Sequence, residues 1–324
     1  MSRLAAGRII VGTSGWRYPS WRGDFYPAGL RQRDELAYIA DRLDSVEING
    51  SFYSLQKPAS YLSWSAQTPP GFVFGVKGGR FITHMLRLRG VETALANFFA
   101  SGVPLLGEKL GPVLWQLPER HTFDAEQLDA FCAQLPRTLA AARELAARHD
   151  ARVDASWLDD DAPTPVEGAA PRPSRTPASA PTPVEEAAPR PSRNPPPAPP
   201  DTPIRYALEP RHPSFDTDAC AAVLARHNIA LVAAHSGDRW PLMRRLTADF
   251  AYVRLHGGPE LYASGYTDGE LERMAEQAHA WSTGAPDGIR RDVFFYFDND
   301  ARGHAPHDAQ ALMRLCAEPP TARA

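Results

Sequence analysis

Residues 8–48, RIIVGTSGWRYPSWRGDFYPAGLRQRDELAYIADRLDSVEI, contain the pattern that decides the fold. Two apolar runs with β-branched residues, at 8–12 and 45–48, predict buried strands. Between them, apolar residues recur at the i, i+3, i+4, i+7 spacing of a helix with one buried stripe: Leu36, Ile39, Ala40 and Leu43. The stretch is therefore expected to form a strand, a helix that packs on the sheet, and a second strand.

The same alternation continues along the chain. Six further runs predict strands at 72–77, 112–117, 205–209, 230–235, 251–256 and 292–297. The fourth helix, from 125 to about 148, is expected to bend at Pro136, and a sixth helix around 241–246 is expected to be short and weak. Eight strand–helix units favour a (β/α)8 TIM barrel, with an open doubly wound sheet as the alternative.

One segment has a different composition. Of the 32 prolines, 15 lie in the 43 residues 161–203, where APTPVEGAAPRPSRTP at 162–177 is repeated as APTPVEEAAPRPSRNP at 180–195. Such a segment buries too little apolar surface to offset the entropy of ordering, so we expect a disordered insert between helix four and strand five. The chain is then divided into a first half-barrel at 1–158 (strands 1–4), the insert at 159–203 and a second half-barrel at 204–324 (strands 5–8). Because the insert joins a helix to the following strand, it should leave the barrel at the face opposite the active mouth.

Composition narrows the class of protein. The sequence contains no run of 18 apolar residues, so we expect no membrane helix. The apolar patch near the start is too short for a signal sequence. Three cysteines without a CxxC pair fit a reducing compartment, so a cytoplasmic location is expected. The net charge of -3 does not support nucleic acid as a partner, although a local basic cleft stays open. The repeated PRPSR resembles SH3-type ligands in composition, so the insert could bind a partner protein.

Polar or ionisable side chains follow nearly every predicted strand. In a parallel barrel these positions meet at one mouth, where catalytic and binding groups gather. The candidate catalytic residues are Glu47, His84, Glu209 and His256. The candidate substrate-binding residues are Trp16, Asn49, Tyr53, Lys77, Gln116, Arg211, His212, Arg254, Tyr266, Asp298 and Asn299. We expect the ionisable ones to line one cleft: Glu47, Lys77, His84, Glu209, Arg211, Arg254 and His256.

Several motifs resemble those of the YecE-like family, bacterial and archaeal proteins of unknown function with a TIM-barrel fold. The blocks are GTSGWRYPSWRGDFYP at 12–27, VEINGSFYSLQKP at 46–58, FVFGVKGGRFITH at 72–84, LGPVLWQLP at 110–118, EPRHPSF at 209–215, YVRLHGG at 252–258 and YFDND at 296–300. The insert, Phe215 in place of a usual Trp and Asp298 in place of a usual Asn depart from the family pattern. The resemblance implies the barrel and implies no established reaction or cofactor.

The mixture of acids and cations favours acid–base chemistry on a small anionic substrate, which could be phosphorylated. Arg and Lys would hold the anion, a glutamate would act as base and a histidine as acid. A metal-dependent hydrolase or phosphodiesterase is the main alternative, but Lys77, Arg211 and Arg254 disfavour a cation at the same mouth, and we assign no metal ligand. A glycosidase fits less well, because the acids follow strands two and five. The charges could also merely neutralise one another, or the protein could bind a ligand, nucleic acid or partner without catalysis.

Overall fold

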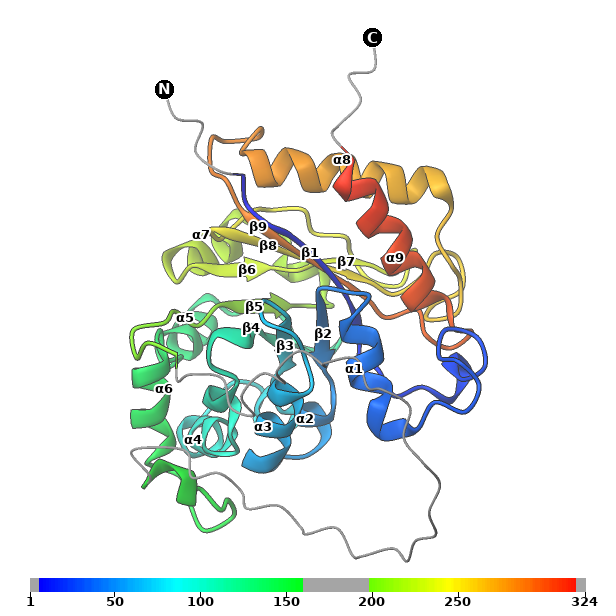
Figure 1. Cartoon of the computed structure of the whole chain (residues 1–324). Coiled ribbons are helices and arrows are strands. Elements are labelled where there is room, and N and C mark those ends of the chain that lie inside the picture. The colour runs from blue at the N-terminus through cyan, green and yellow to red at the C-terminus, as the bar shows by residue number, and fades with distance from the viewer. Residues whose placement is uncertain (1–5, 160–197, 319–324) are drawn as a thin grey trace, which may run out of the picture.

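The computed structural model describes residues 6–159 and 198–318. Its parallel strands form one sheet in the order β6-β5-β4-β3-β2-β1-β9-β8-β7, with helices on the outside (Figure 1). The strands are β1 Ile9–Ser14, β2 Ser45–Ile48, β3 Val73–Lys77, β4 Leu110–Gln116, β5 Tyr206–Glu209, β6 Ile229–Leu231, β7 Ala233–His235, β8 Phe250–Leu255 and β9 Asp292–Phe297. All eight predicted strand positions are therefore occupied.

The sheet closes on itself between β6 and β7. These two strands stand at opposite ends of the hydrogen-bonded order, yet only Val232 separates them in the chain. The Val232 amide donates to the Leu208 carbonyl of β5 (2.9 Å), whereas Ala233 pairs with Val253 of β8. Tilted strands in a barrel shift against their neighbours, so one strand position bonds to β5 in its first half and to β8 in its second. The predicted TIM barrel is confirmed, and the alternative open sheet is not formed. The prediction of one continuous strand at 230–235 is wrong, because this position holds two short strands, β6 and β7.

The helices follow the strands in the expected order. They are α1 Glu35–Ala40, α2 Gly50–Tyr53, α3 Pro58–Ala66, α4 Glu92–Ala100, α5 Ala125–Ala133, α6 Leu139–Ala146, α7 Asp218–Arg226, α8 Asp268–Thr283 and α9 His304–Ala317. Short helical turns occur at η1 Pro19–Trp21, η2 Gln32–Asp34, η3 Phe81–Met85, η4 Val103–Lys109, η5 Ser156–Leu158 and η6 Pro213–Phe215.

Two helix predictions have different outcomes. The fourth helix breaks around Pro136 into α5 and α6, and the Thr138 hydroxyl caps α6 by accepting from the Ala141 amide (3.2 Å). The predicted helix at 241–246 is wrong, because these residues form no hydrogen-bonded turn. The segment buries Met243 without forming a helix.

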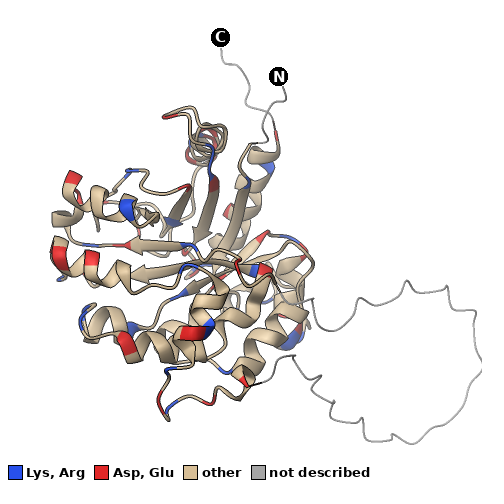
Figure 2. Cartoon of the chain, turned by 90° about the vertical axis from the view of Figure 1, so that its left-hand side faces the viewer, with Lys and Arg blue, Asp and Glu red and all other residues tan. Residues whose placement is uncertain are grey.

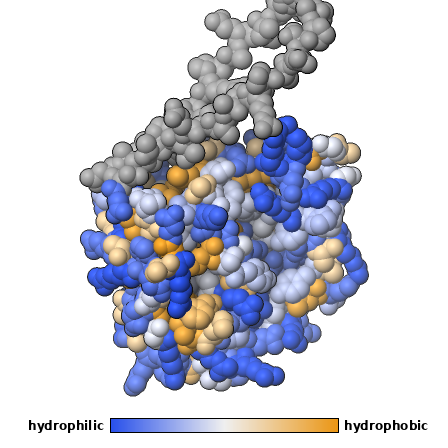
Figure 3. All heavy atoms as spheres, turned by 90° about the horizontal axis from the view of Figure 1, so that it is seen from below, coloured by the Kyte–Doolittle hydropathy of each residue, from blue (hydrophilic) through white to orange (hydrophobic). Residues whose placement is uncertain are grey.

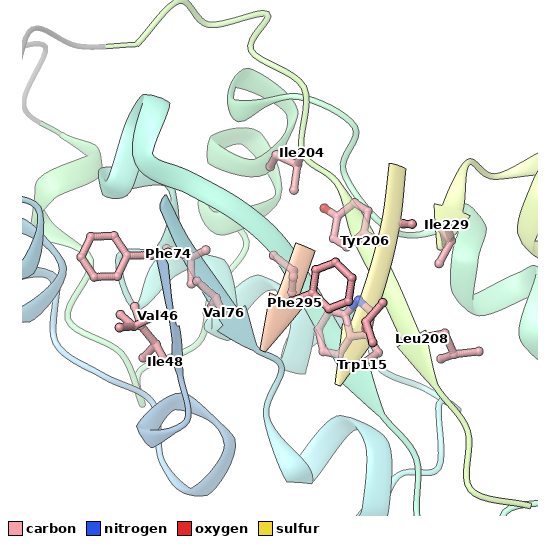
Figure 4. Packing of buried hydrophobic residues seen from close by; sticks show 14 of the residues in the cluster. Val46, Ile48, Phe74, Val76, Trp115, Ile204, Tyr206, Leu208, Ile229 and Phe295 are labelled. Atoms are coloured by element: carbon pink, nitrogen blue, oxygen red, sulfur yellow. The ribbon is translucent and has the colours of Figure 1, made fainter. Parts of the chain in front are cut away.

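Alternate strand residues form two apolar layers. Outward-pointing residues pack under the helices, as Figure 4 shows for Val46 and Ile48, Phe74 and Val76, Trp115, and Tyr206 and Leu208. A separate inner cluster fills the barrel with residues such as Ile10, Val73, Leu114, Phe250 and Phe294. Each fully buried aromatic or aliphatic side chain contributes about 1.5–3 kcal/mol, so these layers hold the barrel wall rigid beneath its mouth.

The predicted insert meets the barrel beside α6. Residues 160–197, which include both repeats, lie outside the described residues. The chain that follows them is bonded in place, with the Ala140 amide donating to the Pro200 carbonyl (2.8 Å) and the Leu139 amide to the Thr202 carbonyl (3.0 Å). Ala198 lies against Gly107, just before β4 begins. This flank is therefore at the amino ends of the strands.

The surface of the described part shows no single dominant charge. Acidic and basic residues are interspersed over the helices in the view of Figure 2. Hydrophobic residues gather in a band on the otherwise largely hydrophilic face of Figure 3. Within residues 6–159 and 198–318, no helix is long and apolar enough to cross a membrane.

Candidate functional site

The inward-pointing residues at the carboxyl ends of the strands are polar. Strand pairing places Ser14 beside Glu47 and Gln116 beside Glu209, so these side chains lie at similar levels. Arg254 of β8 reaches Glu47 of β2, although β9 and β1 stand between these strands in the sheet. Such a contact is possible only through the barrel interior. Period-two alternation therefore explains why these residues, one or two from each strand end, meet.

Arg254 is the centre of this mouth. Its Nη2 lies 2.7 Å from Oε1 of Glu47 and 3.2 Å from Oδ2 of Asp298, and its Nη1 lies 2.9 Å from Oε2 of Glu209. Nη2 also donates to Oγ of Ser14 (2.6 Å). Burial alone would lower the pKa of Arg254, but the three carboxylates hold it well above its usual value. The guanidinium is thus a permanent cation that joins four strand positions.

The glutamates are fixed by this arrangement. Glu47 and Glu209 are fully buried, and Glu47 also accepts from the Ser14 hydroxyl and the Tyr252 hydroxyl, both at 2.7 Å. Although burial raises the pKa of Glu209, Arg254 and then Arg211 hold it well below its usual range. The expected mutual pairing of charges therefore occurs for Glu47, Glu209 and Arg254, and for Arg211, which lies 3.1 Å from Oε1 of Glu209.

An aromatic wall stands on the β7–β8 side of the mouth. The Arg211 guanidinium lies 3.6 Å from the ring centroid of Trp240, whose ring meets His256 edge-on at 5.1 Å. Nδ1 of His256 is 2.9 Å from Oδ2 of Asp298. Tyr262, held at a positive φ of 63°, packs on His256 at 5.5 Å. Sequence reasoning missed Trp240, because its segment adjoins the helix wrongly predicted at 241–246.

Lys77 ends β3 on the opposite side. Within the described part of the chain, no carboxylate lies at ion-pair distance from its Nζ and no hydrogen bond fixes it. Its Nζ is 4.5 Å from the ring centroid of Phe52, and the side chain is partly buried. Burial and the Arg254 cation lower the pKa of Lys77, while Glu47, Asp298 and Glu209 act in the opposite direction.

His84 lies among cations. Its Nδ1 is 2.9 Å from the Thr83 hydroxyl, and its ring meets Phe52 edge-on at 5.2 Å. Burial, followed by the charges of Lys77, Arg211 and Arg80, lowers the pKa of His84 to about 4. The imidazole is therefore neutral at pH 7.

Asp300 is a further acid at the mouth that received no role from the sequence. Burial and the neighbouring Asp298 raise its pKa to about 6. Asp298 has the opposite behaviour, because Arg254 and His256 outweigh burial and hold its pKa well below the usual range. The motif YFDND contained the signal, since its two aspartates are two residues apart, but only the packing shows that their environments differ.

The remaining candidates lie at the edge of this cluster. Gln116 and Trp16 are buried, and Trp16 packs edge-on against Trp64 at 5.6 Å. Asn49 donates to the Ser14 hydroxyl (2.9 Å), which places it beside Glu47. Tyr53 is 71% exposed on the rim.

Three candidates fix loops through their polar atoms. The Tyr266 hydroxyl accepts from the Gly257 amide (2.9 Å), and Asn299 donates to the Ser264 carbonyl (3.0 Å) and to Asp308 (2.8 Å). Nδ1 of His212 accepts from the Ser214 amide (3.2 Å) at the start of η6. These bonds give each residue a structural role, and ligand contact by them stays a prediction.

The residues do not fit a metal ion. Among residues 6–159 and 198–318, no three His, Cys, Asp or Glu side chains are grouped so that they could hold one. The space between Glu47, Glu209 and Asp298, the most acidic part of the mouth, is taken by the Arg254 guanidinium. A hollow of about 640 Å3 opens between the loops after β7 and β8, and its lining, which includes Ser236, Arg239 and Glu270, contains none of the candidate residues.

The chain is similar to known proteins of one family. A family model described as "Protein of unknown function DUF72" matches residues 10–323. The UPF0759 protein YecE of Escherichia coli K12 is 30% identical over 122 residues, which are 38% of this chain and 41% of that protein. The match thus spans less than half of this relative's length.

Two solved structures share the fold. A DUF72 family protein of Thermotoga maritima has a TM-score of 0.67 at 22% identity and covers 96% of this chain and 100% of its own. One from Enterococcus faecalis has a TM-score of 0.63 at 15% identity, with 96% of each chain covered. At these identities, the similarity extends to the barrel and not to a reaction.

Proposed function

Because this chain belongs to the DUF72 family, which confirms the YecE-like resemblance and whose description names no activity, we propose a function from the mouth itself. The protein is an enzyme that acts on a small anionic substrate by acid–base chemistry at the carboxyl ends of the strands. The substrate's anionic group lies on the β3 side, near Lys77, and its reacting part faces the acids that follow β9.

The main support is the unpaired cation of Lys77. Partly buried charges are normally paired, because an ion without a partner loses hydration and gains nothing in return. Arg254 and Arg211 have carboxylate partners, whereas Lys77 has none among the described residues. A bound anion would supply the missing partner. The pKa of His84 is also lowered to about 4, first by burial and then by the charges of Lys77, Arg211 and Arg80.

Asp300 is the best candidate for proton transfer. A general acid or base works best when its pKa is near the working pH, and the pKa of Asp300 is about 6. Glu209 is a weak base in comparison, because Arg254 and Arg211 lower its pKa despite burial. We therefore assign Glu47 and Glu209 to positioning Arg254, and proton transfer to Asp300 with neutral His84 as a hydrogen-bonding group.

A ligand-dependent shift in melting temperature tests the anion site. Inorganic phosphate, a small phosphomonoester and a small dicarboxylate are each compared with a neutral analogue of similar size. Binding to the folded state should raise Tm by about 2–4 °C per kcal/mol for the anions. Lys77→Met should lose this rise, whereas Lys57→Met, at an exposed lysine, should keep it.

The proposal fails if anions stabilise no more than their neutral analogues, or if Lys77→Met responds like the wild type. The class of anion that binds is then screened for turnover. Asp300→Asn should lower the rate by about 10²-fold or more at unchanged anion binding, because it removes the proton donor and keeps the shape. Binding without any turnover would instead support a non-catalytic binding protein.

A further inference from the structure

We infer that Lys77 is the nucleophile of this site and forms an imine with a carbonyl group of the substrate. The inference rests on the proposed function and narrows its substrate class to small anionic aldehydes and ketones. The sequence contains only three lysines, Lys57, Lys77 and Lys109, so each can be compared with the others in one molecule.

The geometry separates these three lysines. Nζ of Lys109 donates to the Ser65 carbonyl (2.7 Å), the Thr68 carbonyl (2.7 Å) and the Thr68 hydroxyl (2.9 Å), so its hydrogens are all engaged. Lys57 is exposed. Lys77 alone among them stands at a strand end inside the mouth, with its Nζ over the Phe52 ring and without a hydrogen-bond acceptor among the described residues. When the amine is deprotonated, no hydrogen bond among the described residues occupies its lone pair.

The surroundings ease the loss of a proton from the Lys77 ammonium group. Burial and the nearby Arg254 cation lower the pKa of Lys77, which increases the fraction that is deprotonated near pH 7. Glu47, Asp298 and Glu209 oppose this shift, but all three carboxylates already bond the Arg254 guanidinium. A desolvated lysine next to another cation is the usual arrangement of an amine that attacks carbonyl carbon.

The reaction balances without any oxidant or reductant. The Lys77 nitrogen attacks the carbonyl carbon, a C–N bond forms, and one proton moves from nitrogen to the carbonyl oxygen. The C–O bond then breaks, the oxygen leaves as water after accepting a second proton, and the remaining N–H proton returns to the acid that supplied it. The net change is amine plus carbonyl to imine plus water. Asp300, with a pKa of about 6, is a carboxyl group at the same mouth that can both accept and donate a proton near this pH.

Reductive trapping tests the inference on the full chain. The protein is incubated with pyridoxal 5′-phosphate, used only as an aldehyde that carries an anionic group, and in parallel with pyridoxal, which lacks the phosphate. Borohydride then reduces any imine, and peptide mass spectrometry measures the label at each lysine. We expect Lys77 to be labelled several-fold faster than Lys57, because its lowered pKa increases the fraction of neutral amine and the mouth brings the probe beside its Nζ. Lys109 should stay unlabelled while the protein is folded.

The matched variant Lys77→Arg separates the inference from the proposed function. Arginine keeps the positive charge that attracts an anion but forms no stable imine, so anion-dependent stabilisation should remain and the label should be lost. Equal labelling of Lys57 and Lys77 in the wild type overturns the inference, and this comparison needs no variant to fold. If the label is absent while phosphate still stabilises the protein through Lys77, the imine is wrong and the anion site stands. Preferential Lys77 labelling by pyridoxal alone supports the imine independently of the anion site.

Discussion

Arg254 shows how one side chain can organise a barrel mouth. Its guanidinium bonds Glu47, Glu209 and Asp298 from three other strand ends, all away from bulk water. In a low-dielectric interior, the loss of one partner leaves the others as uncompensated buried charges. Removal of this cation should therefore be costly to the fold.

Arg254→Met should lower the free energy of unfolding by about 3–5 kcal/mol, because three carboxylates lose their partner. The measurement is urea denaturation at pH 7. Arg245→Met is the matched control, since Arg245 also bonds two carboxylates, Asp216 and Asp218, but is 38% exposed. Water replaces such a surface pair, and the control should cost about 1 kcal/mol or less. Equal losses in the two variants would contradict the central role of Arg254.

Ionisation of Asp300 should lower the stability of the fold, whereas ionisation of Asp298 should raise it. The folded-state pKa of Asp300, about 6, lies above its unfolded value of about 3.9, so stability falls as pH rises between these values and stays lower above them. Asp300→Asn should remove this penalty and stabilise the protein by about 1 kcal/mol above pH 6, with no effect below about pH 4. Chemical denaturation across this pH range checks the prediction.

Asp298→Asn is the control for that experiment. The folded-state pKa of Asp298 is depressed, so its carboxylate stabilises the fold above the unfolded pKa and the contribution is lost as pH falls. The variant should be destabilised at neutral pH and approach the wild type in acid. A stabilising effect of Asp298→Asn at pH 7 would show that the two environments are assigned the wrong way round.

At the scale of the elements, Gly75 of β3 has no side chain and leaves room for the hydroxyl groups of Tyr296 and Tyr252. Tyr296 bonds the Ser45 hydroxyl (2.8 Å) and Tyr252 bonds Glu47. A Cβ on Gly75 would lie 2.9 Å from the Tyr296 hydroxyl and 3.4 Å from that of Tyr252. The absence of a side chain on β3 is therefore part of how β8 and β9 hold Glu47.

Gly75→Ala should destabilise the protein by about 1–3 kcal/mol, because the added methyl group overpacks the barrel interior. Gly79→Ala, four residues further along, is the control, since its added Cβ would meet only the Ser51 carbonyl at 3.8 Å. Its effect should stay within about 0.5 kcal/mol. Thermal unfolding of both variants provides the comparison, and a similar loss in each would contradict the packing argument.

Elements also show what the sequence could and could not predict. The rule that the carboxyl ends of barrel strands meet at one mouth predicted a cluster of ionisable side chains, and Glu47, Glu209 and Arg254 do contact one another; ligand binding and catalysis by these residues stay predictions. The sequence pattern could not predict the division at Val232, since hydrogen-bond partners depend on barrel tilt and leave no trace in hydrophobicity. The sequence pattern also could not predict the raised pKa of Asp300, because the burial of this residue depends on chain segments that are distant in sequence.

At the scale of the whole molecule, the insert should be separable from the barrel. Replacing residues 161–197 with a short Gly–Ser linker should change the free energy of unfolding by about 1 kcal/mol or less, because loop length affects closure entropy only weakly. Extending the deletion to 203 is the control. It removes the bonds from Leu139 and Ala140 to Thr202 and Pro200 and should cost clearly more. Denaturation and circular dichroism of both variants test this, and equal behaviour would contradict it.

The barrel should open most easily at Val232, between β6 and β7. β6 and β7 are three residues each, whereas β1, β8 and β9 have six. Short ladders separate at a lower free-energy cost than the global unfolding of a domain. Deuterium should therefore enter the backbone along β6 and β7 before it enters β1, β8 and β9.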